Sequence, residues 1–170
     1  MMPSIKSLHH WAYRCRDAEE TRHFYEDVLG LPLAHVVSAD IVPSTGEYSP
    51  YVHIFFEMAD GSYVAFFDLG DGEITKRDPD TPRWVNHLAL EVENEEALEI
   101  AKARLEEEGV DVLGITDHDF VKSIYFFDPN DIRLELTCRI SDRKELEKKA
   151  AEAHELLAAW TDRPGRVAAE

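Results

Sequence analysis

The stretch His10-Trp11-Ala12-Tyr13-Arg14-Cys15-Arg16-Asp17 returns in altered form as His87-Leu88-Ala89-Leu90-Glu91-Val92-Glu93-Asn94. Both stretches begin with histidine and alternate apolar with polar or small residues, which is the period of a half-buried β-strand. Both end in a residue that favours the position just before a helix, Asp17 in one and Asn94 in the other. An internal repeat of this kind indicates two copies of one structural unit.

Each copy continues in the same order. A helix is expected after each stretch, ending at Gly30 in the first copy and at Gly109 in the second, because glycine readily adopts the backbone conformation that closes a helix. Turn residues then separate paired strand-like runs, which predicts a hairpin in each copy. The unit is a strand, a helix, a short strand and a hairpin, and a polar link over 75–83 joins the copies. The hairpin strands are expected at 51–58 and 62–69, and at 121–127 and 132–138.

A third helix is expected from about Asp142 to Trp160. Apolar residues recur there at alternating spacings of four and three, as on one face of a helix. Such a stripe needs a covering surface, on the same domain or on a second subunit, whereas residues 161–170 are expected to fray. The stripe consists of Leu146, Ala150, Ala153, Leu157 and Trp160.

The composition argues against several classes of partner. The chain has 170 residues and a formal net charge of −17 at pH 7, so neither a nucleic acid nor an anionic membrane is expected to bind it. No apolar run is long enough to span a membrane, and the first residues lack a secretory apolar stretch, which favours a cytoplasmic location. The two cysteines, Cys15 and Cys138, are too few for a disulfide framework and are expected to be small buried residues.

Side chains with metal-binding chemistry fall on one face of the predicted strands. Alternate residues of a strand share a face, so His10 and His87 lie opposite the apolar residues of their strands. In the last hairpin Glu135 and Tyr125 likewise lie on the face opposite the apolar residues of their strands. They pair directly with each other if the turn is centred on Asn130. Two imidazoles and one carboxylate around a cavity suit a divalent transition metal and leave up to three coordination positions open.

Over about residues 5–139 the chain resembles the vicinal oxygen chelate superfamily, which includes glyoxalases, extradiol dioxygenases, fosfomycin-resistance thiol transferases and epimerases. The resemblance implies an α+β fold with two tandem βαβββ modules, at about 5–72 and 84–139, that form a U-shaped mixed sheet around a metal cavity. The domain would cover 1–139, and 140–170 would be the C-terminal helix and tail. The matching stretches are Leu8-His9-His10-Trp11-Ala12, Val85-Asn86-His87-Leu88-Ala89 and Ile132-Arg133-Leu134-Glu135-Leu136.

The resemblance implies that His10, His87 and Glu135 hold the metal. A glyoxalase-type site would normally take a fourth ligand, a glutamate, from the first hairpin, where this chain has Ala65 or Phe66. Neither side chain can coordinate a metal, which favours a site with three protein ligands.

Within the superfamily, the second module is most similar to type I extradiol catechol dioxygenases. In those enzymes Fe(II) binds both catechol oxygens and dioxygen, and the likeness implies that His118 and Tyr125 contact the bound oxygens. Asp131 stands where the motif usually has Gly or Pro, and aspartate tolerates a left-handed turn better than most residues. The motif is carried by Thr116-Asp117-His118, Ile124-Tyr125, Asp128-Pro129 and Glu135.

One feature of two-domain extradiol enzymes is missing. They usually carry an acid/base histidine in the strand before the second metal histidine, yet residues 63–86 contain no histidine. His53 or Asp68 could take that place; otherwise the metal supports a different reaction.

The sequence thus predicts a single-domain extradiol-type dioxygenase that uses Fe(II), or Mn(II) or another divalent metal, to cleave a catechol-like diol with O2. One alternative is a glyoxalase-, epimerase- or thiol-transferase-type enzyme whose metal polarises a small oxygenated substrate as a Lewis acid. Another is a non-catalytic small-molecule binding protein. A homodimer is expected in each case. The predicted catalytic residues are Tyr125 and His118, and the predicted substrate-binding residues are Phe55, Phe66, Phe67, Phe127 and His53.

Overall fold

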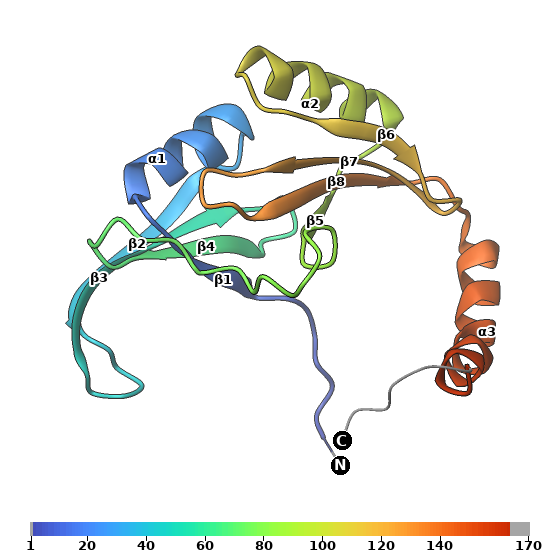
Figure 1. Ribbon diagram of the computed structural model, residues 1–170, viewed down its shortest axis with the longest axis horizontal. Coiled ribbons are helices and arrows are strands. Elements are labelled where there is room, and N and C mark those ends of the chain that lie inside the picture. Colours follow the sequence, from blue (N-terminus) through green and yellow to red (C-terminus); the bar gives the residue numbers. More distant parts are fainter. Residues whose placement is uncertain (1, 164–170) are drawn as a thin grey trace.

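The computed structural model describes residues 2–163, and they form two four-stranded sheets with the same topology. The strand orders are β1-β4-β3-β2 and β5-β8-β7-β6. The parallel pairs are β1 with β4 and β5 with β8. The remaining pairs are antiparallel. Together they form an arch with α1 and α2 on its outer side (Figure 1). The predicted α+β fold of two repeated modules is therefore confirmed.

The elements follow one another as the repeat predicts. The first module contains β1 (His10–Cys15), α1 (Ala18–Arg22), η1 (His23–Val28), β2 (Leu33–Ile41), β3 (Tyr48–Glu57) and β4 (Tyr63–Asp68). The second contains β5 (Leu88–Glu91), α2 (Glu95–Glu107), β6 (Leu113–Asp117), β7 (Val121–Phe127) and β8 (Arg133–Arg139), and α3 (Arg143–Thr161) follows it.

A single apolar core extends through both modules. Phe24 of η1 lies 6.4 Å from Phe126 of β7, measured between ring centroids, and both side chains are buried. Next to them the Tyr25 hydroxyl donates to the Asp128 carboxylate at 3.1 Å. Burial raises the pKa of Asp128 and raises that of Tyr25 well above its usual range, the nearby Asp128 charge adding to the shift of Tyr25. The two modules therefore share one hydrophobic interior.

The turn between β7 and β8 confirms the predicted hairpin register. The Asp128 carboxylate accepts hydrogen bonds from the backbone N–H groups of Asn130 and Ile132. Asp131 adopts a left-handed conformation with φ 59°, which aspartate tolerates better than most residues. Because the turn is centred here, Tyr125 pairs directly with Glu135.

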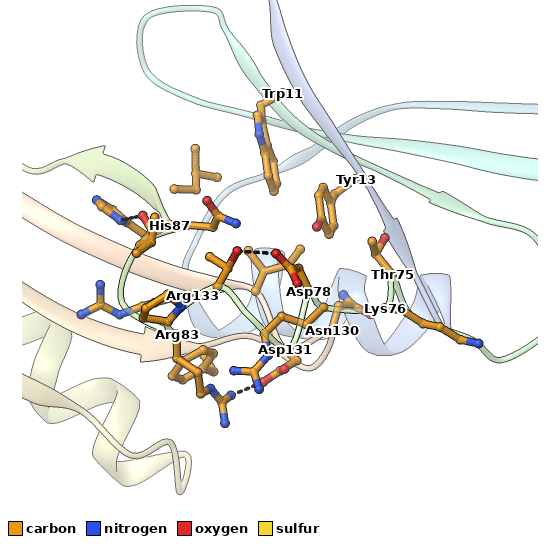
Figure 2. A pocket seen from close by; sticks show the side chains of 18 residues that line it. Trp11, Tyr13, Thr75, Lys76, Asp78, Arg83, His87, Asn130, Asp131 and Arg133 are labelled. Carbon is orange, nitrogen blue, oxygen red and sulfur yellow. Dashed lines mark hydrogen bonds and ion pairs between the residues drawn. The ribbon is translucent and has the colours of Figure 1, made fainter. Parts of the chain in front are cut away.

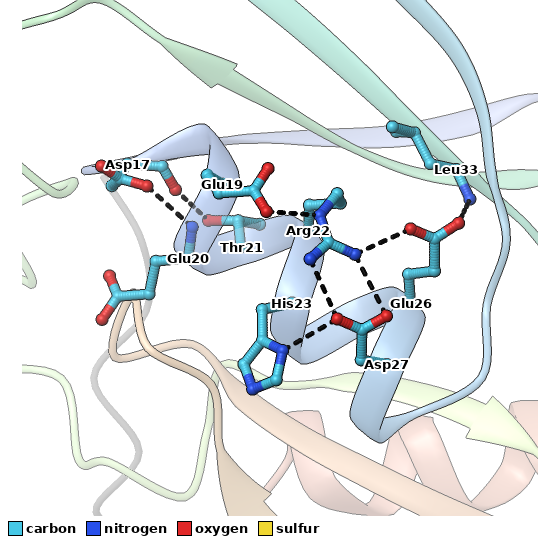
Figure 3. A network of polar contacts seen from close by, with 9 residues as sticks. All are labelled: Asp17, Glu19, Glu20, Thr21, Arg22, His23, Glu26, Asp27 and Leu33. Atoms are coloured by element: carbon cyan, nitrogen blue, oxygen red, sulfur yellow. Dashed lines mark hydrogen bonds and ion pairs between the residues drawn. The ribbon is translucent and has the colours of Figure 1, made fainter.

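The first helix differs from the continuous α-helix expected up to Gly30. It begins as predicted, with the Asp17 side chain accepting from the Glu20 N–H, but it widens into a π-helix from His23 to Val28. Figure 3 shows the polar network along this segment, in which Arg22 binds Glu19, Glu26 and Asp27.

This network predicts a pH-dependent contribution to stability. Arg22 and then His23 lower the pKa of Asp27 to about 2, from 3.8 for an unperturbed aspartate. Between about pH 2 and pH 4 the unfolded chain therefore binds more protons than the folded chain. The stabilisation present above about pH 4 is lost as the pH falls towards 2. We expect Asp27→Asn to lower the urea midpoint at pH 7 and to have less effect at pH 3.

The matched control for this measurement is Glu107→Gln, at an exposed α2 position outside the ion pairs among the described residues. It should leave the urea midpoint nearly unchanged at both pH values. An equal effect of Asp27→Asn at pH 7 and pH 3 would contradict the assignment to the ionised carboxylate.

The C-terminal helix forms as expected, but its stripe is not covered. A capping box of Asp142 and Glu145 begins α3, and none of its residues is buried within the described chain. Leu157 is 62% exposed and Trp160 is 54% exposed. Of the two expected covering surfaces, the same domain does not cover the stripe within residues 2–163, and a second subunit stays a prediction. Of the tail expected to fray, residues 164–170 lie outside the described residues.

The remaining expectations on the chain's interior agree with the structure. Cys15 and Cys138 are both buried and free, and burial raises the pKa of the Cys15 thiol to about 11. Within residues 2–163 no helix combines the length and the hydropathy of a membrane span.

Candidate metal and ligand site

Glu135 lies at the centre of a polar network on the face of the second sheet opposite α2. The residue is 6% exposed. The Ser123 hydroxyl donates to Glu135 Oε1 at 2.5 Å, and the Tyr125 hydroxyl donates to the same oxygen at 3.2 Å. Glu135 Oε2 lies 3.1 Å from His87 Nε2. Strand pairing explains the cluster, because Tyr125 is opposite Glu135 and Ser123 is its neighbour on the same face of β7.

The contact between His87 and Glu135 has the form of two ligands prepared for one cation. His87 Nδ1 lies 3.0 Å from the Val85 carbonyl oxygen, which can only accept, so Nδ1 carries the proton. In a neutral imidazole, Nε2 then presents a lone pair to a carboxylate oxygen. A shared metal ion satisfies both groups, and a histidine ligand commonly donates its other N–H to a backbone carbonyl in this way. The donor chemistry of this pair therefore fits a divalent metal.

Tyr125 connects the carboxylate to a second histidine. His118 Nε2 lies 2.7 Å from the Tyr125 hydroxyl oxygen. Since that hydroxyl donates to Glu135, His118 donates to it, and the three side chains form one chain of hydrogen bonds. Burial, followed by the nearby Glu135 charge, raises the pKa of Tyr125. The predicted catalytic pair therefore lies beside the predicted metal ligands of the second module.

His10 does not join His87 and Glu135. Its Nδ1 lies 2.8 Å from Nδ1 of His9, and its ring packs against Phe55 at 5.7 Å between centroids. Within residues 2–163 no group of three or more His, Cys, Asp or Glu side chains is arranged to hold a metal ion. The expected triad is therefore assembled only in part, with the two predicted ligands of the second module in contact and His10 separate on β1.

His53 is a buried polar side chain near His10. Their ring centroids are 6.1 Å apart, and His53 stacks on Phe67 at 3.6 Å. Its Nε2 is buried without a hydrogen-bond partner among the described residues. Burial, with His10 and His35 nearby, lowers its pKa to about 4, so it is neutral at pH 7 and available as a hydrogen-bond partner for a ligand.

Asp68, the other candidate acid/base residue, is occupied by the backbone. Its carboxylate accepts from the N–H groups of Ala18 and Gly70. It thus has a structural role at the start of α1, which leaves His53 as the candidate of the two.

Phe66 was expected in the pocket wall, and the structure corrects this. Its side chain is fully buried and packs against Tyr25 at 4.8 Å and Phe56 at 6.3 Å, between centroids. Adjacent residues of a strand face opposite ways, so Phe67 lies on the His10 face and Phe66 must lie in the core. Phe55 also lies on the His10 face, whereas Phe127 lies under the Arg83 guanidinium.

The sequence-based prediction missed two parts of the surroundings. Ser123 was recognisable from strand alternation, which places it on the face of Tyr125. The other part is a cleft of about 580 Å³ beside β1, between the link that precedes β5 and the β7–β8 turn. Figure 2 shows Trp11 and Tyr13 on one of its walls, Asn130 and Asp131 opposite, and His87 at one end. We call it the β1 cleft.

Comparisons with solved structures give the same fold. The chain is 19% identical to a glyoxylase/bleomycin resistance protein/dioxygenase domain from Frankia sp. EAN1pec, with a TM-score of 0.65, covering 80% of this chain and 99% of that one. It is 20% identical to a mutant of the fosfomycin resistance protein FosX from Listeria monocytogenes, solved with Mn(II) and 1S,2S-dihydroxypropylphosphonic acid. The TM-score is 0.57, with 85% of this chain and 99% of that chain covered.

A third similar structure is an antibiotic binding protein, TnmS3, from Streptomyces sp. CB03234. It is 20% identical, with a TM-score of 0.55, 81% of this chain covered and 99% of that chain. None of the curated proteins compared with the chain matches it. The model of the Glyoxalase/Bleomycin resistance protein/Dioxygenase superfamily matches residues 7–136. With two repeated modules and a match over most of its length, the chain belongs to this superfamily.

Proposed function

We propose that the protein is a metal-dependent, extradiol-type ring-cleaving dioxygenase that acts on a catechol-like diol. The observation that carries this proposal is the His87–Glu135 pair, in which His87 Nε2 and Glu135 Oε2 lie 3.1 Å apart. His10 is proposed as the third ligand, and Fe(II), or alternatively Mn(II), as the metal. When bound, the metal supplies a common centre for the diol and O2 with positions left open by three protein ligands.

The chain's own residues prepare this site in three ways. Ser123 and Tyr125 orient the Glu135 carboxylate, which is the role that outer hydrogen bonds have around metal ligands. Tyr125 and His118 form a short hydrogen-bonded chain that can hold or move a proton beside the substrate. His53 presents its unpartnered Nε2 on the His10 side and is the proposed acceptor of a substrate proton.

The fourth-ligand position supports a site with three protein ligands. Ala65 is fully buried and aligns with Ala12 of β1 and Phe55 of β3. No oxygen or nitrogen donor is available from an alanine side chain, so the glyoxalase type of coordination is disfavoured. A cytoplasmic location and a homodimer also remain part of this proposal.

The test is ring cleavage by protein loaded anaerobically with Fe(II), mixed with a panel of catechols and then with oxygen. We expect a yellow product and stoichiometric oxygen consumption. Tyr125→Phe also loses the hydrogen bond to Glu135, so it is compared with wild type at an Fe(II) concentration that saturates both proteins. Its kcat should then be lower by about 10²-fold or more, the usual contribution of a positioned acid/base group. Tyr48→Phe, at a position 71% exposed, is the matched control and should behave as wild type.

Two results would refute the proposal. One is the absence of any absorbance change and oxygen uptake across the panel when metal analysis shows the site to be loaded; the Lewis-acid enzymes of the superfamily would then be the better model. The other is a protein that binds no divalent metal, which would favour the binding proteins of the superfamily.

A further inference from the structure

The β1 cleft has an aromatic wall that the proposed reaction does not use. Trp11 and Tyr13 alternate with His10 along β1 and therefore project from the other face of the strand. Their rings are stacked, with centroids 5.1 Å apart and planes 6° apart, and Tyr13 is 36% exposed. A flat ring can pack against such a wall, and about 580 Å³ is within the usual range for small-molecule sites.

The β1 cleft is also lined by basic side chains that form no ion pair with a carboxylate of the described residues. Residues 1–141 contain 28 acidic and 12 basic side chains. Eight of the basic ones form ion pairs with carboxylates. The other four, which have no such partner among the described residues, are Lys6, Lys76, Arg77 and Arg133, and the last three line the β1 cleft.

These three cations have different surroundings. Arg133 stacks over the Tyr125 ring at 4.1 Å and donates to the Trp84 carbonyl, which places it at the His87 end of the cleft. Lys76 lies at the other end, with its ammonium group pointing outward (Figure 2). Arg77 lines the cleft and makes neither a hydrogen bond nor an ion pair with the described residues. Arg77 is thus the guanidinium best available to an anion.

We propose that the β1 cleft binds a planar organic anion, such as an aromatic carboxylate. The ring of the ligand packs against the Trp11–Tyr13 wall, and its carboxylate binds Arg77, with Arg133 and Lys76 adding positive potential at the two ends. Guanidinium suits this role because its fork of N–H donors matches a carboxylate. The lining of the cleft also holds the Arg83–Asp131 ion pair and the carboxylate of Asp78. Its basic side chains still outnumber its acidic ones, so an anion is attracted there although the chain has a net charge of −17.

The proposal does not depend on metal chemistry, so it is tested in protein freed of metal with EDTA. Isothermal titration calorimetry compares 2-naphthoate with the neutral 2-naphthalenemethanol. We expect 2-naphthoate to bind with a stoichiometry of one per chain and at least tenfold more tightly than the neutral probe. Raising the salt concentration should reduce this preference, because the carboxylate contact is partly exposed.

Variants assign the binding to the cleft. Arg77→Gln should weaken 2-naphthoate about tenfold and leave the neutral probe unchanged, whereas Tyr13→Ala should weaken both. Arg104→Gln, which removes a cation paired with Glu108 on α2, is the matched control and should change neither.

Four outcomes would overturn the inference. They are no binding of 2-naphthoate up to millimolar concentration, equal affinity for the two probes, no effect of Arg77→Gln, and loss of binding in Trp160→Ser. The last would place the ligand on the exposed stripe of α3 instead of the cleft.

Discussion

Glu135→Ala is expected to lower the affinity for Fe(II) and Mn(II) by more than about 10²-fold and to remove ring cleavage. A change in an outer hydrogen bond around a metal ligand already costs about 10- to 100-fold, and this variant removes a proposed ligand itself. His87 Nε2 would lose the oxygen that lies 3.1 Å from it. Calorimetric titration of metal-free protein measures the affinity, and the catechol assay measures the activity.

The control for Glu135→Ala is Glu91→Ala, which removes a carboxylate from β5 that is ion-paired with Arg139. It should bind metal as wild type does. Since Glu135 is buried and satisfies two hydroxyl groups, the variant also needs a circular dichroism melt to show that it is folded. Unchanged metal affinity in folded Glu135→Ala would show that Glu135 is not a ligand.

Phe126→Ala is expected to destabilise the whole chain by about 3–5 kcal/mol, the usual cost of deleting a buried aromatic side chain. Phe126 is 1% exposed and meets Phe24 of the first module. The deletion would therefore leave a cavity at the junction of the modules. Urea unfolding followed by tryptophan fluorescence measures the loss.

Phe120→Ala serves as the comparison, because Phe120 is 42% exposed and its truncation should cost less than about 1 kcal/mol. If the modules were independent, Phe126→Ala would broaden the transition into two steps and leave the first module unaffected. A single transition shifted to lower urea agrees with one shared core.

Much of the fold was predictable because it depends on local patterns. Strand alternation at His10 and His87, the capping residues Asp17 and Asn94, and the turn at Asn130 each act over a few residues. Repetition of the pattern then indicated two modules. The opposition of Tyr125 and Glu135 also followed from the turn, since hairpin register depends on where the chain reverses.

The errors arose where one pattern supports two arrangements. Phe66 and Phe67 are both aromatic and adjacent, yet alternation allows only one of them on the His10 face. The stripe of α3 indicates a helix with an apolar face, but it does not specify what covers that face, and the described chain leaves it exposed. The π-helix from His23 to Val28 had no recognised signal in the sequence.

Short-range spacing along the chain was enough to specify the repeated module, its strand and helix order, and the chemistry of the side chains on each face. Which of those side chains meet depends on how the two sheets are placed in space. The His87–Glu135 contact and the Tyr125–His118 bond lie within the second module, whereas His10 lies on a different sheet and remains apart. The β1 cleft likewise needs β1, the link and a distant turn to come together, and no local pattern in the sequence specifies that meeting.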